Sequence, residues 1–399
     1  MKLTLRNFAF ALAFFVVQSC NKNGIRAVGS ITSLNVTSGP YNTTVVITGA
    51  GFSSVTISDQ VFFNGKAATI VSATGTQITA LVPTGAGTGP VTVSVNGGAL
   101  ITGPVFTYQQ TAVVSTMAAT VSGGFPWGIA ADAAGNAYFS DLNNNLVYKV
   151  TSAGVVSPFA VNVAGQTPFF TSPSGMVQDA AGNFYVAGGK NITKIAAGGA
   201  ISIITIPQAS ELLSVVIDAN GNFYTADYGK QVIYKTTPAG VSTVFVGSGT
   251  NASVDGTGTA ASFSYPNGLA IDANGNIYDL DAGTSVLRKI TPAGIVTTIA
   301  GTGKAGATNG VGTAASFNAP TGLVVDNAGN IYIADSSNNL IRKIDVNGTV
   351  STFAGSGNAT EADGIGTSAS FKYPECITLD AAGNLYVTDY AAIRKITLK

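Results

Sequence analysis

The sequence predicts an all-β chain in which a small sandwich domain precedes a six-bladed β-propeller. The motif Asp-x-x-Gly-Asn-x-Tyr occurs six times between residues 132 and 386, and residues 30–108 alternate apolar with polar residues in short runs. Charged residues make up 10% of the 399 residues, and 49 residues are glycine, which suits strands joined by tight turns.

The composition excludes several kinds of functional site. The net charge is zero and no basic run occurs, so no nucleic-acid partner is expected. The chain has no histidine, which excludes both a nucleophile activated by an imidazole base and a zinc site built from His and Cys. The two cysteines, Cys20 and Cys376, cannot form a disulfide framework once Cys20 is assigned to an export signal.

Residues 1–20 have the pattern of an export signal. Lys2 and Arg6 precede an apolar run from Phe8 to Val17, which is too short to span a bilayer. The segment Val17-Gln18-Ser19-Cys20 resembles a bacterial lipobox, and this resemblance implies cleavage before Cys20 and lipidation of its sulfur. An ordinary secretory signal with an incidental cysteine is the alternative. We expect residues 21–29 to be a tether, and the lipid to be the only membrane attachment.

Residues 30–108 have the pattern of half-buried strands separated by Gly, Pro and Asn. The clearest runs are 44–48, 61–63, 78–82 and 91–95. Ser38-Gly39-Pro40, the run from Ile47 to Phe52 and the run from Val61 to Gly65 resemble an IPT/TIG domain, an immunoglobulin-like sandwich. The resemblance implies a spacer or protein-contact module.

The second domain, residues 109–399, is a repeat array. Successive Gly-Asn pairs of the motif are 47, 39, 54, 54 and 54 residues apart, and each unit contains four β-type runs, such as 323–325, 331–334, 340–344 and 350–354. Four strands per repeat indicate propeller blades. In the motif, the Asp side chain is expected to accept backbone N–H groups two or three residues on, while Gly adopts the left-handed conformation of the turn.

The array resembles NHL repeats. The Pro-x-Gly-Leu start of each unit, as at Pro266, and the Ile-Arg-Lys-Ile run ending at Ile344 carry this resemblance. After Ile396 too few residues remain for a fourth strand, whereas residues 112–118 match that strand and precede the first unit. We therefore predict that this N-terminal strand closes the ring and removes two open sheet edges.

The NHL resemblance implies that the start of each first strand lies at the top face, beside the central channel. Function is expected at positions where the repeats differ. The predicted ligand-binding ring residues are Trp127, Asn267, Thr321 and Glu375, with Tyr265 and Tyr373 beside them. Aromatic faces next to polar groups suit sugar rings or aromatic peptide side chains.

Other recurring residues have structural interpretations. Phe263, Phe317 and Phe371 are expected to anchor long loops to their blades. A recurring Asp after the second strand, as at Asp335, is expected to cap a turn, and a recurring Lys on the third strand, as at Lys343, to pack its stem on the blade.

We therefore predict a binding or scaffold protein, without catalytic residues, that holds a glycan, peptide or protein partner. It is expected to be monomeric and lipid-anchored in the cell envelope of a bacterium, at the outer membrane or facing the periplasm. The alternative is a propeller hydrolase or lyase whose carboxylate metal site would use Glu375, Asn267 and Glu211. No cofactor is predicted. Ca²⁺ is the one candidate ion, either at a ring of the recurring aspartates or at this alternative site, where two or three ligands are few for an ion that prefers six to eight oxygens.

Overall fold

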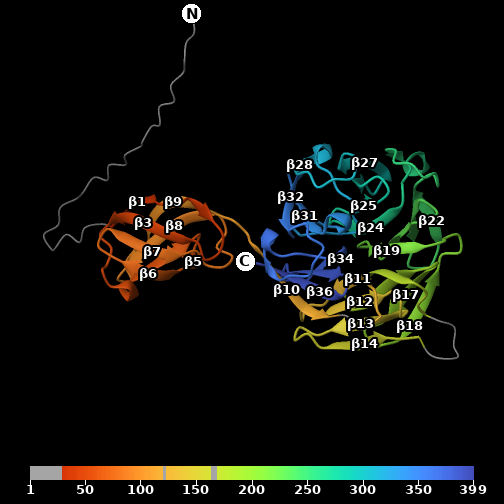
Figure 1. The fold of residues 1–399 in the computed structure, drawn as a ribbon, viewed down its shortest axis with the longest axis horizontal. Helices are drawn as coiled ribbons and strands as arrows, with labels where there is room; N and C mark the ends of the chain where they lie inside the picture. The colour runs from red at the N-terminus through yellow and green to blue at the C-terminus, as the bar shows by residue number, and fades with distance from the viewer. Residues whose placement is uncertain (1–28, 120–122, 163–168) are drawn as a thin grey trace, which may run out of the picture. The chain divides into compact units, whose positions relative to one another are not determined.

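The computed structural model describes residues 29–119, 123–162 and 169–399 of the chain. Residues 1–28, with the predicted export signal and Cys20, lie outside the described residues. The chain divides into two compact units, one that ends at Gln109 and one from Gln110 to Lys399. Both consist of β-sheets joined by turns (Figure 1). No described helix is long and apolar enough to cross a membrane.

The described part of the first unit is a sandwich of two sheets. One sheet has the order β1 (Ser30–Leu34), β3 (Thr44–Ala50), β7 (Gln77–Leu81), β6 (Thr69–Ala73). The other has the order β2 (Ser38–Gly39), β9 (Ile101–Tyr108), β8 (Gly89–Val95), β4 (Asp59–Phe63), β5 (Lys66–Ala67), with the short helix η1 (Thr56–Ser58) before β4. Inward-facing apolar residues of both sheets form one core, in which the Phe63 and Phe106 rings meet edge to face at 5.1 Å. The four expected strands are all present.

Within the described residues, the second unit contains six antiparallel sheets, numbered one to six along the chain. Sheet one consists of β11 (Pro126–Ala131), β12 (Ala137–Asp141), β13 (Leu146–Val150) and β14 (Val156–Ala160). Sheet two consists of β15 (Pro173–Gln178), β16 (Phe184–Gly188), β17 (Asn191–Ile195) and β18 (Ile201–Thr205). Sheet three consists of β19 (Leu212–Ile217), β20 (Phe223–Asp227), β21 (Val232–Thr236) and β22 (Ser242–Val246). Sheet four consists of β24 (Pro266–Ile271), β25 (Ile277–Asp281), β26 (Val286–Ile290) and β27 (Ile295–Ala300). Sheet five consists of β29 (Gly322–Val325), β30 (Ile331–Asp335), β31 (Leu340–Ile344) and β32 (Thr349–Ala354). Sheet six consists of β34 (Pro374–Leu379), β35 (Leu385–Asp389), β36 (Ala392–Leu398) and β10 (Ala112–Ala119).

The outer strand of sheet six comes from before sheet one in the chain. β10 pairs antiparallel with β36 from Ala112 opposite Leu398 to Ala119 opposite Ala392. Backbone hydrogen bonds join Thr111 and Lys399 in both directions, at 2.7 and 2.9 Å. The side chains of Ala112 and Val114 are buried in the core of sheet six. The ends of this unit are thus held in one sheet.

The first strands of the six sheets line the middle of the second unit. Each first strand contacts that of the next sheet, and β11 also contacts β34. Together they surround a narrow cavity of about 170 Å³, to which every first strand contributes residues. Cys376, on the last of these strands, is a free thiol whose pKa burial raises to about 11, so it is an unreactive group.

The repeated motif forms the same turn in every sheet. In sheet three, Asp218 accepts the N–H groups of Asn220 and Asn222 at 2.9 Å, and its other oxygen accepts the side chains of Asn222 and Tyr224 at 2.8 and 3.2 Å. These contacts reach two and four residues along the chain, rather than two or three as predicted. Burial raises the pKa of Asp218, but the hydrogen bonds outweigh it and leave the pKa below its usual value. Gly221 has φ = 78°, which a residue with a side chain rarely adopts.

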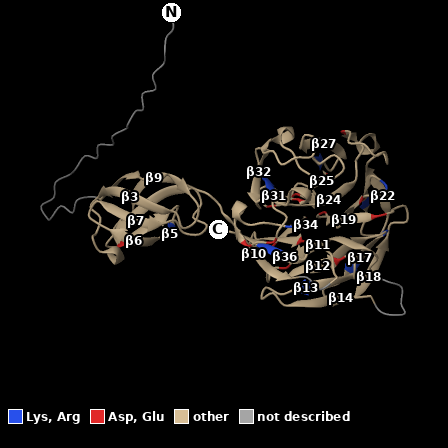
Figure 2. Ribbon diagram, in the orientation of Figure 1, with Lys and Arg blue, Asp and Glu red and all other residues tan. Residues whose placement is uncertain are grey.

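The motif tyrosine also supports the recurring lysine of the third strand. Lys235 lies opposite Tyr224 in the register, and its Nζ is 5.4 Å from the centre of that ring. The equivalent lysine of each other sheet lies 5.1–5.9 Å from its own tyrosine. The lysine stems therefore pack on the sheets as expected, and the charged residues are distributed over all six sheets (Figure 2).

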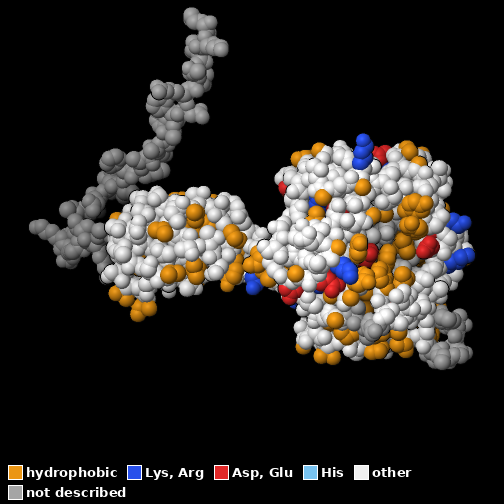
Figure 3. Space-filling model, viewed as in Figure 1, with side chains coloured by type: hydrophobic (Ala, Val, Ile, Leu, Met, Phe, Trp, Pro, Cys, Tyr) orange, Lys and Arg blue, Asp and Glu red, His pale blue; other side chains and the backbone are white. Residues whose placement is uncertain are grey.

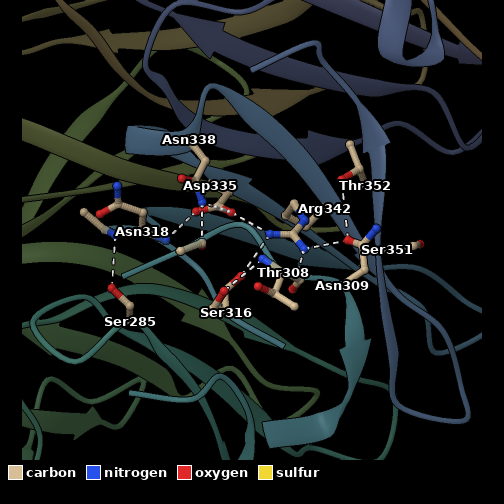
Figure 4. Close-up of polar contacts among 12 residues, drawn as sticks. Ser285, Thr308, Asn309, Ser316, Asn318, Asp335, Asn338, Arg342, Ser351 and Thr352 are labelled. Carbon is tan, nitrogen blue, oxygen red and sulfur yellow. Dashed lines mark hydrogen bonds and ion pairs between the residues drawn. The ribbon is translucent and has the colours of Figure 1, made fainter. Parts of the chain in front are cut away.

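Long loops enter sheets four, five and six and are held by completely buried arginines. In sheet five, Arg342 pairs with Asp335 at 2.9 Å, and both side chains are 0% exposed. Its guanidinium also donates to the carbonyls of Ser316 and Thr308, at 3.0 and 3.1 Å, and to Oδ1 of Asn309 at 2.8 Å (Figure 4). Phe317 is buried beneath it, with the guanidinium carbon 5.5 Å from the ring centre.

Sheets four and six repeat this arrangement with one difference. Arg288 and Arg394 are equally buried and stack on Phe263 and Phe371, which confirms all three phenylalanines as loop anchors. Each of these arginines bonds a second aspartate where sheet five has Asn309, namely Asp255 and Asp363. The loops also add the short strands β23 (Gly256–Thr257), β28 (Gly310–Val311) and β33 (Gly364–Ile365) to the outer edges of sheets four to six. The 3-10 helices η2 (Gly258–Ala260), η3 (Gly312–Ala314) and η5 (Gly366–Ser368) follow them, and η4 (Ser336–Asn338) forms the turn after β30.

Sheet four contains one buried carboxyl group that its neighbours lack. Asp279 is 0% exposed, and within the described residues both of its side-chain oxygens are without a hydrogen-bond partner. Burial raises the pKa of Asp279 well above its usual value, and the charge of Asp281 raises it further. The equivalent positions hold apolar residues in sheets one, two, five and six, such as Ile333 and Val387, and the uncharged Thr225 in sheet three. Burial therefore favours the protonated, uncharged form of Asp279.

Candidate functional site

A cavity of about 550 Å³ lies where the first strands of sheets one to five begin. Equivalent positions of these five sheets contribute Trp127, Ser174, Leu213, Asn267 and Thr321 to its wall. The remaining lining residues lie in the neighbouring turns: Leu142, Ser172, Glu211, Tyr228, Tyr265, Ala282, Gly283 and Ala319. The volume is within the range typical of small-ligand sites. Hydrophobic side chains also gather on the face of the second unit seen in Figure 3.

Four of the six predicted ring residues line this cavity. Trp127, Asn267, Thr321 and Tyr265 are brought together, whereas Glu375 and Tyr373 are not among the lining residues. Glu375 is partly buried, and burial raises its pKa to about 7. Its backbone carbonyl accepts the hydroxyl of the wall residue Thr321 at 2.6 Å, so Glu375 lies next to the wall. Sheet six is thus the one whose first-strand position does not reach the cavity within the described residues.

Two stacked tyrosines form one wall. The rings of Tyr228 and Tyr265 lie 4.7 Å apart at 29°. Gln231 joins them, because its Oε1 accepts the N–H of Tyr265 and its Nε2 donates to the carbonyl of Tyr228, both at 2.6 Å. Burial raises the pKa of Tyr228, and the nearby Tyr265 and Glu211 add to the effect. Gln231 therefore holds the two backbones together while the two rings stack.

Sequence reasoning missed Tyr228, although a signal was present. Tyr228 follows the recurring turn-capping Asp227, and the equivalent residues Leu142 and Ala282 also line the cavity. This position differs from sheet to sheet while the aspartate before it recurs. The aspartates behave as predicted: Asp227 is 0% exposed and accepts the N–H groups of Ser210, Gly229 and Lys230. The variable residue after a framework aspartate is therefore a second set of site positions.

Trp127 belongs to the opposite side of the cavity. The contacts between first strands run in the order of sheets one to six, so sheet one and sheet four are separated by two sheets in either direction. The Trp127 indole is partly buried and lies 5.9 Å from the ring of Phe125. Aromatic side chains therefore stand on two sides of the cavity, Trp127 on one and the pair of Tyr228 and Tyr265 on the other.

Some polar groups of the cavity are hydrogen-bonded within the protein, and others are not. The Thr321 hydroxyl is bonded to Glu375, and the Ser174 hydroxyl donates to the carbonyl of Ser172 at 3.0 Å. Asn267 is 6% exposed, yet within the described residues its carboxamide has no hydrogen bond. The Glu211 side chain, which is exposed, likewise makes none with any described residue. The free groups are thus one sheltered amide and one carboxylate.

Among the described lining residues, the charge of the cavity wall is negative. Glu211 is its one ionisable acid, and among the described lining residues none is Lys or Arg. Lys230 lies in an adjacent depression of about 400 Å³ that also includes Glu211 and Ser172. Among the described residues, no group of three or more Asp, Glu or Cys side chains is placed to hold a metal ion. The arrangement suits recognition of a neutral or positively charged ligand.

Two family models each match one part of the chain. Residues 30–109 match the family model of the IPT/TIG domain, and residues 303–366 match that of the Teneurin NHL domain. The resemblance to IPT/TIG and NHL-repeat proteins is thereby confirmed. No curated protein matches the chain.

Three solved structures extend this likeness. A Bacteroides thetaiotaomicron protein of unknown function is 22% identical, with a TM-score of 0.63 over 94% of this chain and 99% of its own. An auxiliary nutrient binding protein from the same organism is 18% identical, with a TM-score of 0.59 over 93% of this chain and 97% of its own. Virginiamycin B lyase from Staphylococcus aureus is 14% identical, with a TM-score of 0.50 over 73% of this chain and all of its own. This likeness concerns the fold, an all-β chain with an IPT/TIG domain and a propeller-like unit.

Proposed function

We propose that this chain is a binding protein whose second unit holds a glycan, peptide or protein segment in the 550 Å³ cavity. The observation that supports the proposal is which sequence positions form the cavity wall. The wall is built from positions where the six repeats differ, such as Trp127, Leu213 and Asn267, while the repeated residues form turns, lysine supports and sheet cores. Variation confined to one concave surface is expected of a binding site on a repeat framework.

We infer that the second unit is a six-bladed propeller and that β10 closes its ring as the outer strand of blade six. The pairing of β10 with β36 and the succession of contacts among the first strands support this inference. In such a ring the cavity lies at one mouth of the central channel. The binding residues are then held in place by contacts between neighbouring blades.

We further propose that the protein acts as a monomer in a bacterial cell envelope, anchored through a lipid on Cys20. The charged and apolar pattern of residues 1–20 supports this location. The similarity of fold to an auxiliary nutrient binding protein of Bacteroides supports a binding role in the same setting. The IPT/TIG domain would then stand between anchor and propeller as a spacer.

Trp127 provides the test. It is the one tryptophan of the sequence and it lines the cavity, so its fluorescence reports occupancy directly. The protein is titrated with neutral oligosaccharides, cell-wall peptides and Ca²⁺. We expect a saturable change that Tyr265→Ala abolishes and Ile57→Ser leaves intact, because Ile57 is a 91% exposed residue of the first unit. No response to any probe would overturn the proposal.

The same titration addresses the hydrolase or lyase alternative. That mechanism would place a metal between Glu375, Asn267 and Glu211, but Glu375 is not among the residues that line the cavity with the other two. A Ca²⁺ response that is lost in Glu375→Gln would favour the enzyme. A sugar or peptide response that is the same with and without Ca²⁺ would favour the binding protein.

A further inference from the structure

We propose that the ligand of this cavity is a neutral sugar ring, stacked on the aromatic wall and hydrogen-bonded to the carboxamide of Asn267. The inference rests on the proposed binding function and adds the chemical class of the ligand. Three independent features of the cavity carry it: its aromatic surfaces, the unpartnered amide, and the sign of its charge.

The aromatic surfaces fit the apolar face of a sugar ring. The rings of Tyr228 and Tyr265 are stacked on one another, and Gln231 joins the backbones of the two residues, so the pair offers a flat aromatic surface. Trp127 stands on the other side of the cavity. A pyranose ring exposes C–H groups on its faces and hydroxyl groups around its edge, and it binds a flat aromatic surface with little loss of conformational entropy.

Asn267 is the observation that most directly points to a ligand. Its residue is 94% removed from solvent by the fold, yet its carboxamide has no protein partner among the described residues. Neither polar atom of this carboxamide is among the completely buried unpaired atoms, so both are accessible to a ligand that supplies an acceptor and a donor. Two adjacent sugar hydroxyls provide this pair, since each hydroxyl both donates and accepts.

The charge of the cavity sets the selectivity among sugars. Glu211 is the charged group of the wall, and no described Lys or Arg lines it. Glu211 can accept hydrogen bonds from hydroxyl groups but repels a carboxylate or phosphate. Because Glu211 is exposed, water screens this repulsion, so we expect discrimination of about tenfold, the equivalent of roughly 1.4 kcal/mol. Acidic sugars and sugar phosphates should therefore bind more weakly than neutral ones.

A peptide fits these features less well. An extended peptide presents a regular row of backbone N–H and C=O groups and is usually bound by a matching row on a strand edge. Here the Thr321 and Ser174 hydroxyls are already committed within the protein, and the free groups are two separate side chains. Discrete groups beside aromatic platforms match the scattered hydroxyls of a sugar.

The test is a comparison of matched sugars by isothermal titration calorimetry and Trp127 fluorescence. Neutral hexasaccharides of glucose, mannose, xylose and galactose are titrated, together with hexagalacturonate and its methyl ester, which differ in charge at the same positions. Cell-wall peptides serve as the competing ligand class. The variants are Asn267→Leu, which keeps the shape of the side chain but removes both hydrogen-bonding groups, and Glu211→Gln, which removes the charge of an exposed side chain.

We expect at least one neutral hexasaccharide to bind, the methyl ester to bind about tenfold more tightly than the free acid, and Glu211→Gln to reduce that ratio towards one. Asn267→Leu should weaken binding tenfold or more with an unchanged unfolding midpoint, since two hydrogen bonds are lost. Equal binding of acid and ester, or an unchanged affinity of Asn267→Leu, would overturn the inference. Binding of peptides but not sugars at Trp127 would overturn the sugar inference and leave the proposed binding function intact. The absence of a response to every probe would overturn both the inference and the proposed function.

Discussion

The completely buried ion pair between Arg342 and Asp335 makes a quantitative prediction about stability. We consider Arg342→Met, which keeps an unbranched apolar stem above Phe317 but removes the guanidinium. Asp335 would then be a carboxylate that is 0% exposed and has lost its charged partner at 2.9 Å. The carbonyls of Ser316 and Thr308 would lose their donors at the same time.

The expected loss follows from these contacts. Removing one member of a buried ion pair costs about 3–5 kcal/mol. Asp335 keeps hydrogen bonds from the N–H of Asn318 and the amide of Asn338, both at 2.8 Å, so we place the loss near the lower end, at about 3 kcal/mol. For a unit that runs from Gln110 to Lys399 the unfolding midpoint should fall by about 5 °C.

Trp127 makes the assay specific, because the one tryptophan of the sequence lies in the second unit. Urea and thermal unfolding are followed by its fluorescence in the wild type, in Arg342→Met and in the double variant Arg342→Met/Asp335→Asn. The double variant should recover about 1–2 kcal/mol, since it removes the stranded charge but keeps an acceptor for Asn318. A single variant within 1 kcal/mol of the wild type, or a double variant less stable than the single one, would refute this reasoning.

Three further predictions concern the second unit. Deletion of residues 112–119 should lower its unfolding midpoint by tens of degrees or prevent folding, because β10 supplies the outer strand of sheet six; an unchanged midpoint would remove the basis for ring closure. Asp279→Val should raise the free energy of unfolding by about 1–3 kcal/mol, because it replaces an unpartnered buried carboxyl with the residue found at this position in sheets two and six; a loss of stability would show a role for the acid. Burial raises the folded-state pKa of Glu375 to about 7, so the free energy of unfolding of the wild type should fall by up to about 3 kcal/mol as the pH rises from 4.5 to 7. In chemical denaturation, Glu375→Gln should reduce this dependence on pH, and an equal dependence in both proteins would contradict the raised pKa of Glu375.

The local framework was predictable because it depends on neighbours in the sequence. The turn at Asp218 uses contacts within six residues, and the strands around it alternate as the pattern requires. The buried Arg342 was harder to predict, since an arginine on a strand is normally exposed and its burial depends on the loop residues Ser316 and Asn309, 26 and 33 positions away.

The site was predictable only in part for the same reason. The variable position of each first strand identified Trp127, Asn267 and Thr321, because strand starts converge in any propeller. The sequence could not reveal that Glu375 would not be among the residues that line the cavity. It also could not reveal that Tyr228, after the second strand of sheet three, would stack on Tyr265, before the first strand of sheet four. Those outcomes depend on how neighbouring sheets pack, which no local pattern records.

The most direct test of the central claim is a crystal structure of the protein with its tightest-binding neutral hexasaccharide. We predict that one sugar ring lies in the cavity against Tyr265, with adjacent hydroxyls bonded to the Asn267 carboxamide and the chain emerging past Trp127. A sugar bound elsewhere, such as along the outer strands β14 and β18 or on the first unit, with the cavity filled only by water, would contradict it.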